Sequence, residues 1–427
     1  MHENPDSVNY LNTFTLLCLR VVIDRTPKYR YDRMETEWRV PVSTPTPNAQ
    51  RLLRTLIADG PTYRADLARS LDVSRATVTN LTTRLQSSGW IEETDPEPGS
   101  LKNLIGTTPK LGVFASILFL LDSCAVTVAT LDGRVFGELT EACPIDAAAE
   151  ERLTVAGNLL DDLVAHLPGA ARSLRAVHLA VDTQMDSLSG DIYAQRASSR
   201  WFGVNPKRYF AERFGVAVHV QNSARLEGLA EYLWGAGRDR GNMLYVDVSY
   251  GITSGHVMDG VIQSGARGGS GELGHTVYDW DGPLCSCGNP GCLMQYASVP
   301  ALLRDFRILN EGSEDWEQFR ARCAEGDPAS TSIASNAATV LGRMLTNVCH
   351  TIDPEVVVIS GKVAREIPGF VDQVSSVLHA TALPLVGRNV HVVGGELADM
   401  LAVTARAGIH SLRAIDDLIT SASSLHS

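Results

Sequence analysis

Residues 265–295 read GARGGSGELGHTVYDWDGPLCSCGNPGCLMQ, and this stretch decides how the rest of the chain is interpreted. Four metal-binding side chains fall within eighteen residues of it: His275, Cys285, Cys287 and Cys292. Three thiolates and one imidazole form a ligand set that tetrahedral Zn²⁺ adopts in structural sites, and no position is left for a water molecule. The stretch therefore predicts a structural zinc site, whose loop also carries Glu272 to a pocket.

Two other interpretations compete with zinc. In the first, the four side chains are unrelated core or surface residues. In the second they form a disulfide, but Cys285 and Cys287 are separated by a single residue, which makes a bridge between them difficult to close. The chain has eight cysteines, and the five outside the zinc set are scattered, as expected for reduced thiols in a cytoplasm.

The glycines, the glutamate, the histidine and the cysteines of this stretch follow one another in the order of a known family signature. The pattern GxxGxxGExGH, followed by CxCGxxGC, is similar to that of the ROK family, which contains sugar kinases and sugar-responsive transcriptional repressors. The resemblance extends from about Gly112 to the C-terminus. It implies an α/β domain of two lobes, actin-like and ribonuclease-H-like, with a cleft between them. The N-terminal third must decide which branch of the family the chain resembles.

Length and composition are those of a globular protein. The chain has 427 residues, of which 44% are hydrophobic and 20% are charged, which allows two or three domains. No apolar run approaches about 18 residues, so we expect no membrane-spanning helix. The apolar segment 16–23 lacks the basic start and the cleavage site of a signal peptide. The net charge of −12 argues against a broadly basic surface but allows one local basic face.

Residues 1–46 are interpreted as a flexible segment and linker, because Pro41, Pro45 and Pro47 alternate with serine and threonine. Upstream of these prolines the sequence has mixed charge and no clear period. Met34 opens a sequence that would start cleanly before the first expected helix, so one hypothesis places the native start there. An intact peptide from residues 2–20, detected in the protein from its own host, would refute that hypothesis.

Residues 47–107 predict a winged helix-turn-helix. Asn48 is expected to cap a first helix whose leucines share one face, and Gly60-Pro61 ends that helix. A second helix is expected over 64–71. A third runs from the cap Ser74 to Gln86 and turns four residues inward: Ala76, Val78, Leu81 and Leu85. A strand begins after Gly89, and residues 92–106 form the wing.

The outward face of the third helix is the predicted DNA reader. It carries short hydrogen-bonding groups and guanidinium groups suited to phosphates and base edges in a major groove: Ser74, Arg75, Thr77, Thr79, Asn80 and Arg84. Between residues 51 and 84, six arginines stand against three aspartates. This balance favours nucleic acid over the other interpretation, a helical bundle for protein contacts. Lys102 and Asn103 could touch the DNA backbone, although the outgoing edge of the wing is acidic.

From residue 108 the pattern changes to that of an α/β domain. Strands are expected over 113–121, 125–130, 176–181, 216–220, 242–248, 253–258 and 356–360, and helices over 150–166, 224–234, 299–309, 315–324, 332–351 and 399–412. Residues 108–235 with the C-terminal helix are assigned to a first lobe, and 236–398 with zinc loop 275–292 to a second. This division follows the resemblance, since no internal repeat is visible.

The resemblance allows the kinase branch to be tested. A ROK kinase needs a glycine turn for the ATP phosphates, where this chain has Leu118 to Asp122 without a glycine. It needs an Asn-Asp pair whose aspartate accepts the sugar proton, and here the pair is Asn222-Ser223. The second glycine-rich turn, 249–255, keeps two glycines, and a later Gly-Gly is Ser360-Gly361. A positioned base contributes roughly 10²–10⁴-fold to the rate, so we expect phosphoryl transfer to be lost.

The sugar pocket implied by the resemblance is kept in part. Asn222, Glu272 and His275 match positions where family members bind hexose hydroxyls, whereas Ala197 and Met294 replace an Asn and a Glu. His275 would serve twice, with one ring nitrogen on zinc and the other facing the cleft. Alternatively, Glu272 only holds the zinc loop in place. The effector stays open between a modified, amino, oligomeric or phosphorylated sugar and no ligand at all.

These features predict a cytoplasmic, DNA-binding transcriptional regulator of the ROK type rather than an enzyme. We expect it to repress genes of carbohydrate uptake or breakdown, with activation left open. A homodimer or dimer of dimers would place two winged helices on a two-fold operator in double-stranded DNA, and a sugar-type effector in the cleft would release them. The alternatives are an active sugar kinase with a DNA-binding appendage and a protein-interaction module.

Overall fold

The computed structural model describes residues 47–94, 103–120, 122–144, 146–167, 173–193, 201–310, 315–398 and 400–412. All of these belong to one compact unit, Val40–Ser427. The predicted flexible segment 1–46 and the hypothesis of a start at Met34 lie outside the described residues. No helix in the described ranges is long and apolar enough to cross a membrane.

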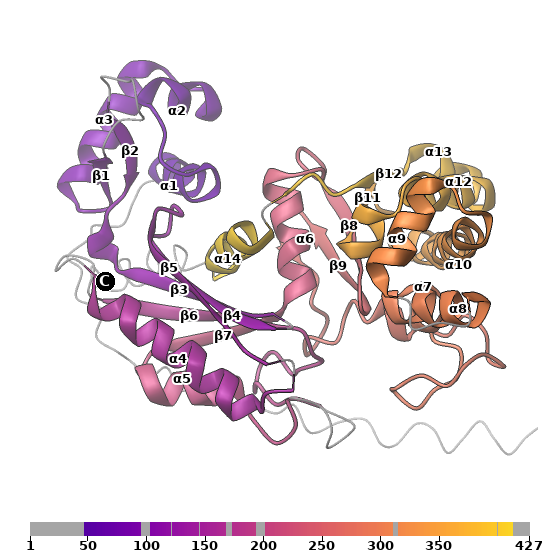
Figure 1. The fold of residues 1–427 in the computed structure, drawn as a ribbon. Coiled ribbons are helices and arrows are strands. Elements are labelled where there is room, and N and C mark those ends of the chain that lie inside the picture. The colour runs from indigo at the N-terminus through magenta and orange to yellow at the C-terminus, as the bar shows by residue number, and fades with distance from the viewer. Residues whose placement is uncertain are drawn as a thin grey trace, which may run out of the picture. The chain divides into compact units, whose positions relative to one another are not determined.

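The N-terminal module is three helices followed by a two-stranded hairpin (Figure 1). Its elements are α1 (Pro47–Asp59), α2 (Arg64–Leu71), α3 (Arg75–Ser87), β1 (Ile91–Thr94) and β2 (Leu104–Thr107). The turn between α2 and α3 is closed by Asp72, which adopts the left-handed conformation with φ 53°. The strands pair antiparallel, so the predicted winged helix-turn-helix is confirmed in order and type.

Two details of this module differ from the prediction. The first helix begins at Pro47, which fits the first helical position because it has no N–H to donate, so Asn48 lies inside the helix rather than capping it. On α3, Ala76 is exposed, and the buried residues are Val78, Thr82 and Leu85. Thr82 is 0% exposed and donates its hydroxyl to the carbonyl of Thr79 at 3.1 Å, which lets a polar residue occupy the inward face.

The first sheet of the larger domain has the strand order β5-β4-β3-β6-β7. Its strands are β3 (Val113–Phe119), β4 (Ser123–Ala129), β5 (Val135–Ala142), β6 (Leu174–Val181) and β7 (Ala217–Asn222). The first three are antiparallel, and β6 and β7 extend the sheet in parallel. Helices α4 (Ala149–Ala165) and α5 (Pro206–Phe214) cover one face, and α14 (Met400–Ser411) covers the other. Every residue of β3 is buried for that reason.

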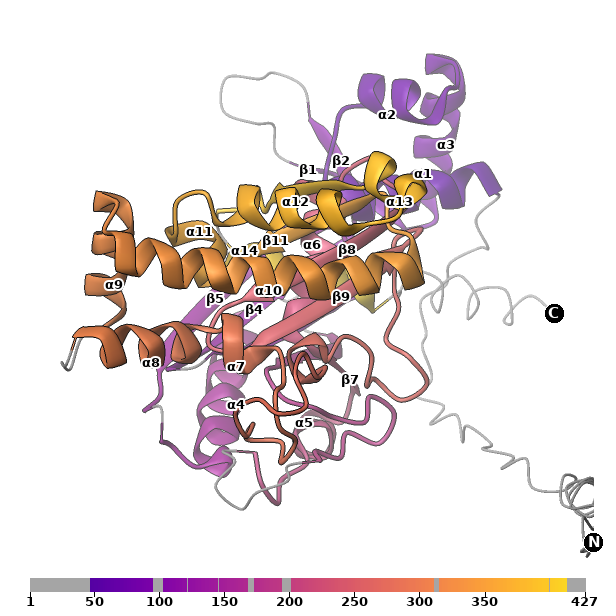
Figure 2. The ribbon, with the colours of Figure 1, turned by 90° about the vertical axis from the view of Figure 1, so that its right-hand side faces the viewer.

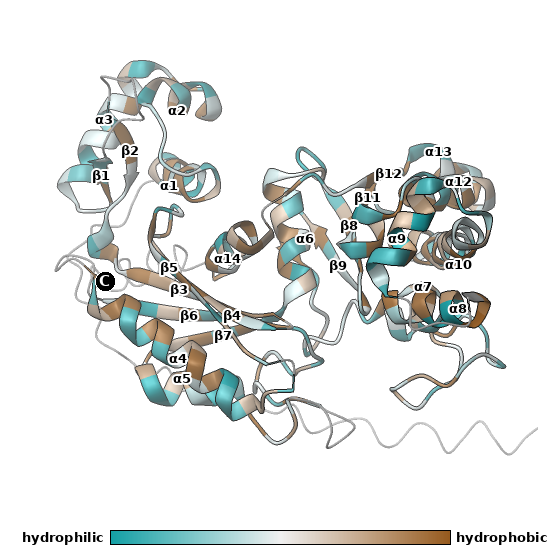
Figure 3. Cartoon of the chain, viewed as in Figure 1, coloured by the Kyte–Doolittle hydropathy of each residue, from teal (hydrophilic) through white to brown (hydrophobic). Residues whose placement is uncertain are grey.

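The second sheet has the order β10-β9-β8-β11-β12. Its strands are β8 (Asn242–Val248), β9 (Ile252–Met258), β10 (Val261–Ile262), β11 (Val356–Ser360) and β12 (His391–Gly394). The outer helices are α7 (Met294–Ala297), α8 (Val299–Asn310), α9 (Trp316–Glu325), α10 (Pro328–Ile352), α11 (Gly361–Glu366), α12 (Phe370–Thr381) and α13 (Pro384–Asn389). Figure 2 shows α8, α10 and α12 packed side by side. Hydrophobic residues concentrate on the strands and inward helix faces (Figure 3).

Helix α6 (Ser223–Trp234) lies between the two sheets. It packs on β8 and β9 of the second sheet and against α14, which itself packs on β3 and β4 of the first. The N-terminal module also joins this assembly, because its core residues Leu56 and Ile105 belong to one buried cluster with Phe114 of β3 and Ile409 of α14. The winged helix is therefore seated on the first sheet and α14.

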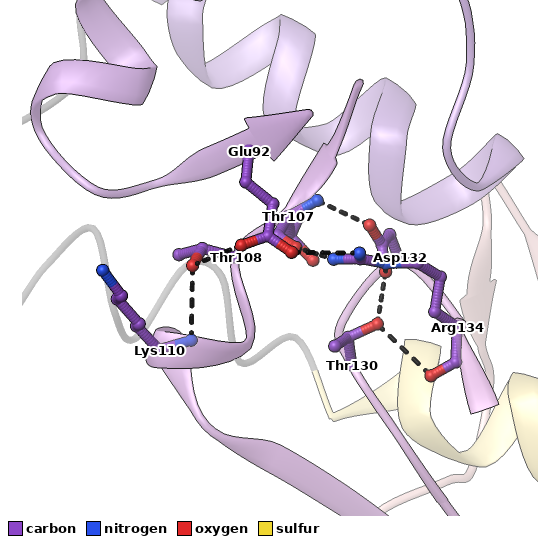
Figure 4. Close-up of polar contacts among 7 residues, drawn as sticks. All are labelled: Glu92, Thr107, Thr108, Lys110, Thr130, Asp132 and Arg134. Carbon is purple, nitrogen blue, oxygen red and sulfur yellow. Dashed lines mark hydrogen bonds and ion pairs between the residues drawn. The ribbon is translucent and has the colours of Figure 1, made fainter. Parts of the chain in front are cut away.

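A polar cluster completes this attachment (Figure 4). The buried carboxylate of Asp132, in the turn between β4 and β5, accepts from the backbone N–H of Thr107 at 2.5 Å. Arg134 donates to the carboxylate of Glu92 at 3.1 Å and to the carbonyl oxygen of Thr107. The base of the wing is thus fixed to the first sheet by charged hydrogen bonds.

Candidate functional site

The exposed face of α3 holds four of the six predicted DNA-binding residues. Four side chains are exposed at helical spacing: Arg75, Thr79, Asn80 and Arg84. The other two, Ser74 and Thr77, hydrogen-bond to each other at the N-terminal cap of the helix. The Ser74 hydroxyl accepts from the N–H of Thr77 at 3.1 Å and lies 2.8 Å from its hydroxyl. Sequence reasoning missed two residues on the same exposed stripe, Ala76 and Thr83, because it had placed Ala76 inward.

In the part of the chain that the structure describes, some arginines of the N-terminal module form ion pairs with carboxylates, and others do not. Arg64 pairs with Glu93 at 2.8 Å, and Arg69 pairs with Asp66 on its own helix. Within the described ranges, no carboxylate pairs with either arginine of α3, Arg75 or Arg84. The helix that would enter a groove therefore presents two arginines without a carboxylate partner among the described residues, and Arg51 of α1 adds a third cation that donates to the carbonyl of Leu71 at 3.3 Å.

The described part of the wing has fewer side chains available for contact with DNA than α3 has. The Asn103 side chain donates to Glu93 at 3.1 Å, the carboxylate that also receives Arg64. These hydrogen bonds lower the pKa of Glu93, led by that from Arg64. Asn103 is therefore engaged inside the module, and Lys102 lies outside the described residues.

The four predicted metal ligands come together. The ligand atoms of His275, Cys285, Cys287 and Cys292 all lie within 4.8 Å of one another. The sulfurs of Cys287 and Cys292 are 3.5 Å apart, and Cys285 Sγ lies 3.7 Å from His275 Nδ1. A tetrahedron with metal–sulfur bonds of about 2.3 Å has edges of roughly 3.8 Å, so the donor set fits a small tetrahedral ion.

The backbone of this loop is folded tightly enough to present the four donors. The N–H of Cys285 donates to the carbonyl of Asn289 at 2.9 Å, closing a short turn around Cys287. Gly291 has φ 64°, and a Cβ there would lie 1.5 Å from the carbonyl oxygen of Asp279. Only glycine fits that position, which explains the glycine directly before Cys292.

Asn222, the first predicted ligand-binding residue, closes β7 and caps α6. Its side-chain oxygen accepts from the N–H of Ala224 at 3.0 Å, and its own N–H donates to the side chain of Gln221 at 3.0 Å. Gln221 in turn donates to the hydroxyl of Ser264 at 2.8 Å. The side-chain oxygen of Asn222 therefore has a structural role, and the amide NH₂ is the part left for a ligand.

Glu272 lies beside a residue that sequence reasoning missed. Arg225, 3% exposed on the first turn of α6, has an Nη atom 3.6 Å from Glu272 Oε1. Its guanidinium also donates to Gln221 at 2.9 Å and to the carbonyl oxygen of Ser270. Arg225 thus ties α6 to the segment before the zinc loop. The sequence signal that could have identified Arg225 is its position three residues after Asn222, about one helical turn from a predicted ligand-binding residue.

The Arg225–Glu272 contact leaves hydrogen-bonding capacity unused. Glu272 Oε1 and Arg225 Nε are enclosed and have no hydrogen-bond partner. Leaving such an atom unsatisfied costs about 1–3 kcal/mol, so a ligand or a small loop movement that satisfied them would be favoured.

Ala197, the predicted site of a lost Asn, lies outside the described residues, and Met294 is the first residue of α7.

The turns where the resemblance would place ATP phosphates make hydrogen bonds within the protein. At the end of β3, Leu118 and Phe119 are buried, and the carbonyl of Leu120 accepts from Arg152 at 3.0 Å. In the second sheet, the Ser249 hydroxyl accepts from the N–H of Lys362, in the first turn of α11, at 3.0 Å. A side-chain hydroxyl therefore lies at the helix end where an anion could otherwise bind.

Two carboxyl groups are enclosed next to these turns. Burial and the neighbouring Asp247 carboxylate raise the pKa of Glu227 on α6 to about 8, and burial raises the pKa of Asp247 to about 6. Tyr245 donates its hydroxyl to Glu227 at 2.8 Å, and Ser249 donates to Asp247 at 2.9 Å. Glu227 is therefore protonated near neutral pH.

Comparison with known proteins adds independent findings. A sequence profile described as the ROK family matches residues 142–401, more than half of the chain, and one described as the MarR family matches residues 46–97. The chain is 26% identical over 372 residues to a putative xylose repressor of Caldicellulosiruptor sp. (strain Rt8B.4), covering 83% of this chain and 93% of that protein. It is 25% identical over 378 residues to the DNA-binding transcriptional dual regulator NagC of Escherichia coli (strain K12), covering 84% and 91%.

Solved structures share the fold. A ROK family transcriptional regulator, described as a homolog of the E. coli MLC protein, aligns with a TM-score of 0.69 and 22% identity over 88% of this chain and 98% of that one. A ROK hexokinase from Thermus thermophilus aligns with a TM-score of 0.61 and 24% identity over 71% and 99%.

Proposed function

The chain belongs to the ROK family and carries a MarR-type winged helix, and from this premise we propose that it is a DNA-binding transcriptional repressor of carbohydrate genes, released from its operator by a sugar-type ligand. The two relatives aligned by sequence are named as transcriptional regulators, which supports a regulator rather than an enzyme. The observation that carries the proposal is the exposed face of α3, where Arg75 and Arg84 have no carboxylate partner in the described structure.

The DNA contacts are proposed for the exposed stripe of α3. Arg75 and Asn80 would reach base edges, and Arg84 would reach a phosphate, while Ser74 and Thr77 fix the start of the helix. A homodimer or dimer of dimers would present two such helices to a two-fold site. With DNA as its partner, the protein would act in the cytoplasm.

The effector site is proposed around Glu272, Asn222 and His275. The names of two relatives suggest D-xylose and N-acetyl-D-glucosamine as first candidates: the putative xylose repressor above, and an N-acetylglucosamine repressor of Escherichia coli O6:H1 that is 25% identical over 378 residues. The unfilled oxygen of Glu272 can accept from a hydroxyl, and the enclosed Nε–H of Arg225 can donate to one once the loop moves. This pair suits vicinal hydroxyls of a polyol.

The metal site is proposed to be structural and to hold Zn²⁺ through His275, Cys285, Cys287 and Cys292. When bound, the ion would supply no chemistry beyond cross-linking the loop, because four protein donors complete its coordination. The loop then holds Glu272 next to α6. The proposed division into a winged helix over 47–107 and two lobes over 108–427 is supported by the two separate sheets.

A sugar kinase with a DNA-binding appendage is the second candidate, since kinases share the fold. It is disfavoured by the turn at Leu118–Asp122, by Ser223 in place of an aspartate, and by Ser249 at the start of α11. Incubation with ATP and a panel of sugars tests it directly. Turnover that disappears in Glu272→Gln would establish kinase activity.

The deciding experiment for the regulator measures retardation of DNA from the region upstream of the protein's own gene, at low salt, with and without each candidate sugar. We expect specific retardation that a sugar weakens and that Arg75→Ala reduces. Arg320→Ala on α9, which pairs with Glu317 at 2.8 Å, is the matched control and should leave binding intact. Absence of retardation would favour the protein-interaction alternative.

A further inference from the structure

Helix α6 joins the proposed effector site to the winged helix, and this inference rests on the proposed function. Asn222 caps its first turn, and Arg225 in that turn contacts Ser270 and lies 3.6 Å from Glu272. Trp234 is its last residue. Twelve residues of helix span about 18 Å, so one rigid element extends from Asn222 and Arg225, at the proposed effector site, to Trp234.

At its far end, α6 meets the last turn of α1. The indole N–H of Trp234 donates to the carbonyl oxygen of Ala58 at 3.0 Å. Arg406 of α14 donates to the same oxygen at 3.1 Å, and its guanidinium carbon lies 4.3 Å from the centre of the Trp234 ring. Carbonyls in the last turn of a helix have no partner within the helix, so these two donors complete the end of α1.

The two donors belong to different halves of the larger domain. Trp234 is on α6, which packs on β8 and β9 of the second sheet, whereas Arg406 is on α14, which packs on β3, β4 and β6 of the first. The other attachments of the winged helix are the hydrogen bond from Thr107 to Asp132 and the packing of its core on Phe114 and Ile409, which involve the first sheet and α14. Movement of α6 against the first sheet would therefore alter the Trp234 attachment and leave the others.

The packing around α6 leaves room for such a movement. A cavity of about 240 Å³ lies between α6, α14, β7 and β10, and its walls include Leu229 of α6, His178 of β6 and His410 of α14. Because this pocket is partly open to solvent, the side chains that line it can rearrange if α6 moves.

We infer that Trp234 is a positioning residue that couples the effector site to the orientation of the winged helix. A ligand that draws Arg225 and Glu272 together shifts α6, and the shift changes the hydrogen bond from Trp234 to Ala58. The coupling exists only to the extent that the ligand has different affinities for the two positions of α6. It does not depend on which polyol binds.

The first experiment requires neither DNA nor ligand. Amide hydrogen exchange of residues 56–60 is compared in the full-length protein and in Arg225→Lys, which keeps the charge but shortens the reach to Ser270. We expect exchange of these amides to be about threefold to tenfold faster, from the loss of roughly one hydrogen bond at α1. Arg213→Lys, which loses a bond to Asp161 on the outer face of the first sheet, is the control and should not change them.

The second variant separates transmission from general loosening. In the Trp234→Phe background, which already lacks the N–H, Arg225→Lys should give no further increase in exchange of residues 56–60. If Arg225→Lys leaves these amides unchanged in the wild-type background, or acts equally with and without Trp234, the inference is wrong. This outcome is independent of whether the protein binds DNA.

The third measurement links the contact to regulation. The ratio of DNA affinities without and with D-xylose or N-acetyl-D-glucosamine should fall about threefold to tenfold in Trp234→Phe, with sugar binding itself unchanged. The control is Trp316→Phe on α9, since Trp316 also donates its N–H, to Glu366 at 2.6 Å, and also lies beside a cation, Lys362 at 5.7 Å. Equal effects of the two substitutions would overturn the inference. Failure of the wild type to bind DNA would refute the proposed function. The exchange experiments would still decide whether Trp234 couples α6 to α1.

Discussion

The carboxylate of Asp132 lies 2.5 Å from the backbone nitrogen of Thr107, and both residues are buried at the junction of the wing and the first sheet. The same carboxylate accepts from the hydroxyl of Thr130 and from Arg134. A charged acceptor with three donors gives the junction a defined geometry, because each bond fixes a different direction (Figure 4). The base of the wing is thus held to the turn between β4 and β5 by hydrogen bonds in addition to the covalent connection.

Asp132→Asn should destabilise the protein by about 1–3 kcal/mol, because an amide offers one acceptor oxygen to several buried donors and leaves at least one unpaired. Thermal or urea unfolding measures this change. The control is Glu92→Gln, which removes the neighbouring ion pair with Arg134 at a partly exposed position and should cost about 0–1 kcal/mol. Equal losses in the two variants would show that Asp132 contributes only as a surface charge.

Arg75→Ala should weaken binding to the operator by about 1–3 kcal/mol and relax base preference at one position, if Arg75 makes a bidentate contact with a base. Fluorescence anisotropy on the operator, on single-base variants and on random duplex separates the two effects. Equal loss on all duplexes, with a shallower dependence on salt, would show that Arg75 touches phosphate alone.

Local patterns were enough to predict the winged helix and the metal cluster. The cap Ser74, the second-helix range 64–71 and the Cys285–Cys292 spacing depend on residues that are neighbours in sequence, and the structure has them as expected. The strand over 356–360 was also predicted, since a short run of buried β-branched residues has few alternatives.

Features that depend on distant partners were missed. The edge strand β5 (Val135–Ala142) was not predicted, because its residues are mostly exposed and give no buried alternation. Arg225 and Trp234 gained their roles from contacts with Glu272 and Ala58, which lie 47 and 176 residues away. No window of sequence contains both members of either pair.

Cys287→Ser should remove the metal and loosen its loop. The purified wild-type protein is expected to contain about one zinc ion per chain by elemental analysis, and the variant far less. Amide exchange over residues 277–292 should rise and the melting temperature should fall, since an ion bound only by the folded state stabilises it. Cys323→Ser, outside the cluster, should keep the metal. A wild-type protein without metal, or a variant that retains it, would contradict the proposed site.

The enclosed carboxyl of Glu227 should make stability fall as pH rises. Its pKa is raised from 4.5 to about 8 by burial and by Asp247, so between these pH values the folded protein keeps a proton that the unfolded chain has released. The unfolding free energy therefore decreases with rising pH across that window, and the loss is complete above about pH 8.

Glu227→Gln carries a permanently neutral side chain and should flatten this dependence. Urea unfolding between pH 5.5 and 8.5 measures the unfolding free energy of both proteins. We expect the value for the variant to rise relative to that of the wild type as pH rises, and the difference between the two to level off near pH 8. The control is Glu317→Gln on α9, where the side chain is 64% exposed and the pH profile should stay that of the wild type. A constant difference between Glu227→Gln and wild type at all pH values would show that Glu227 is ionised in the folded protein throughout.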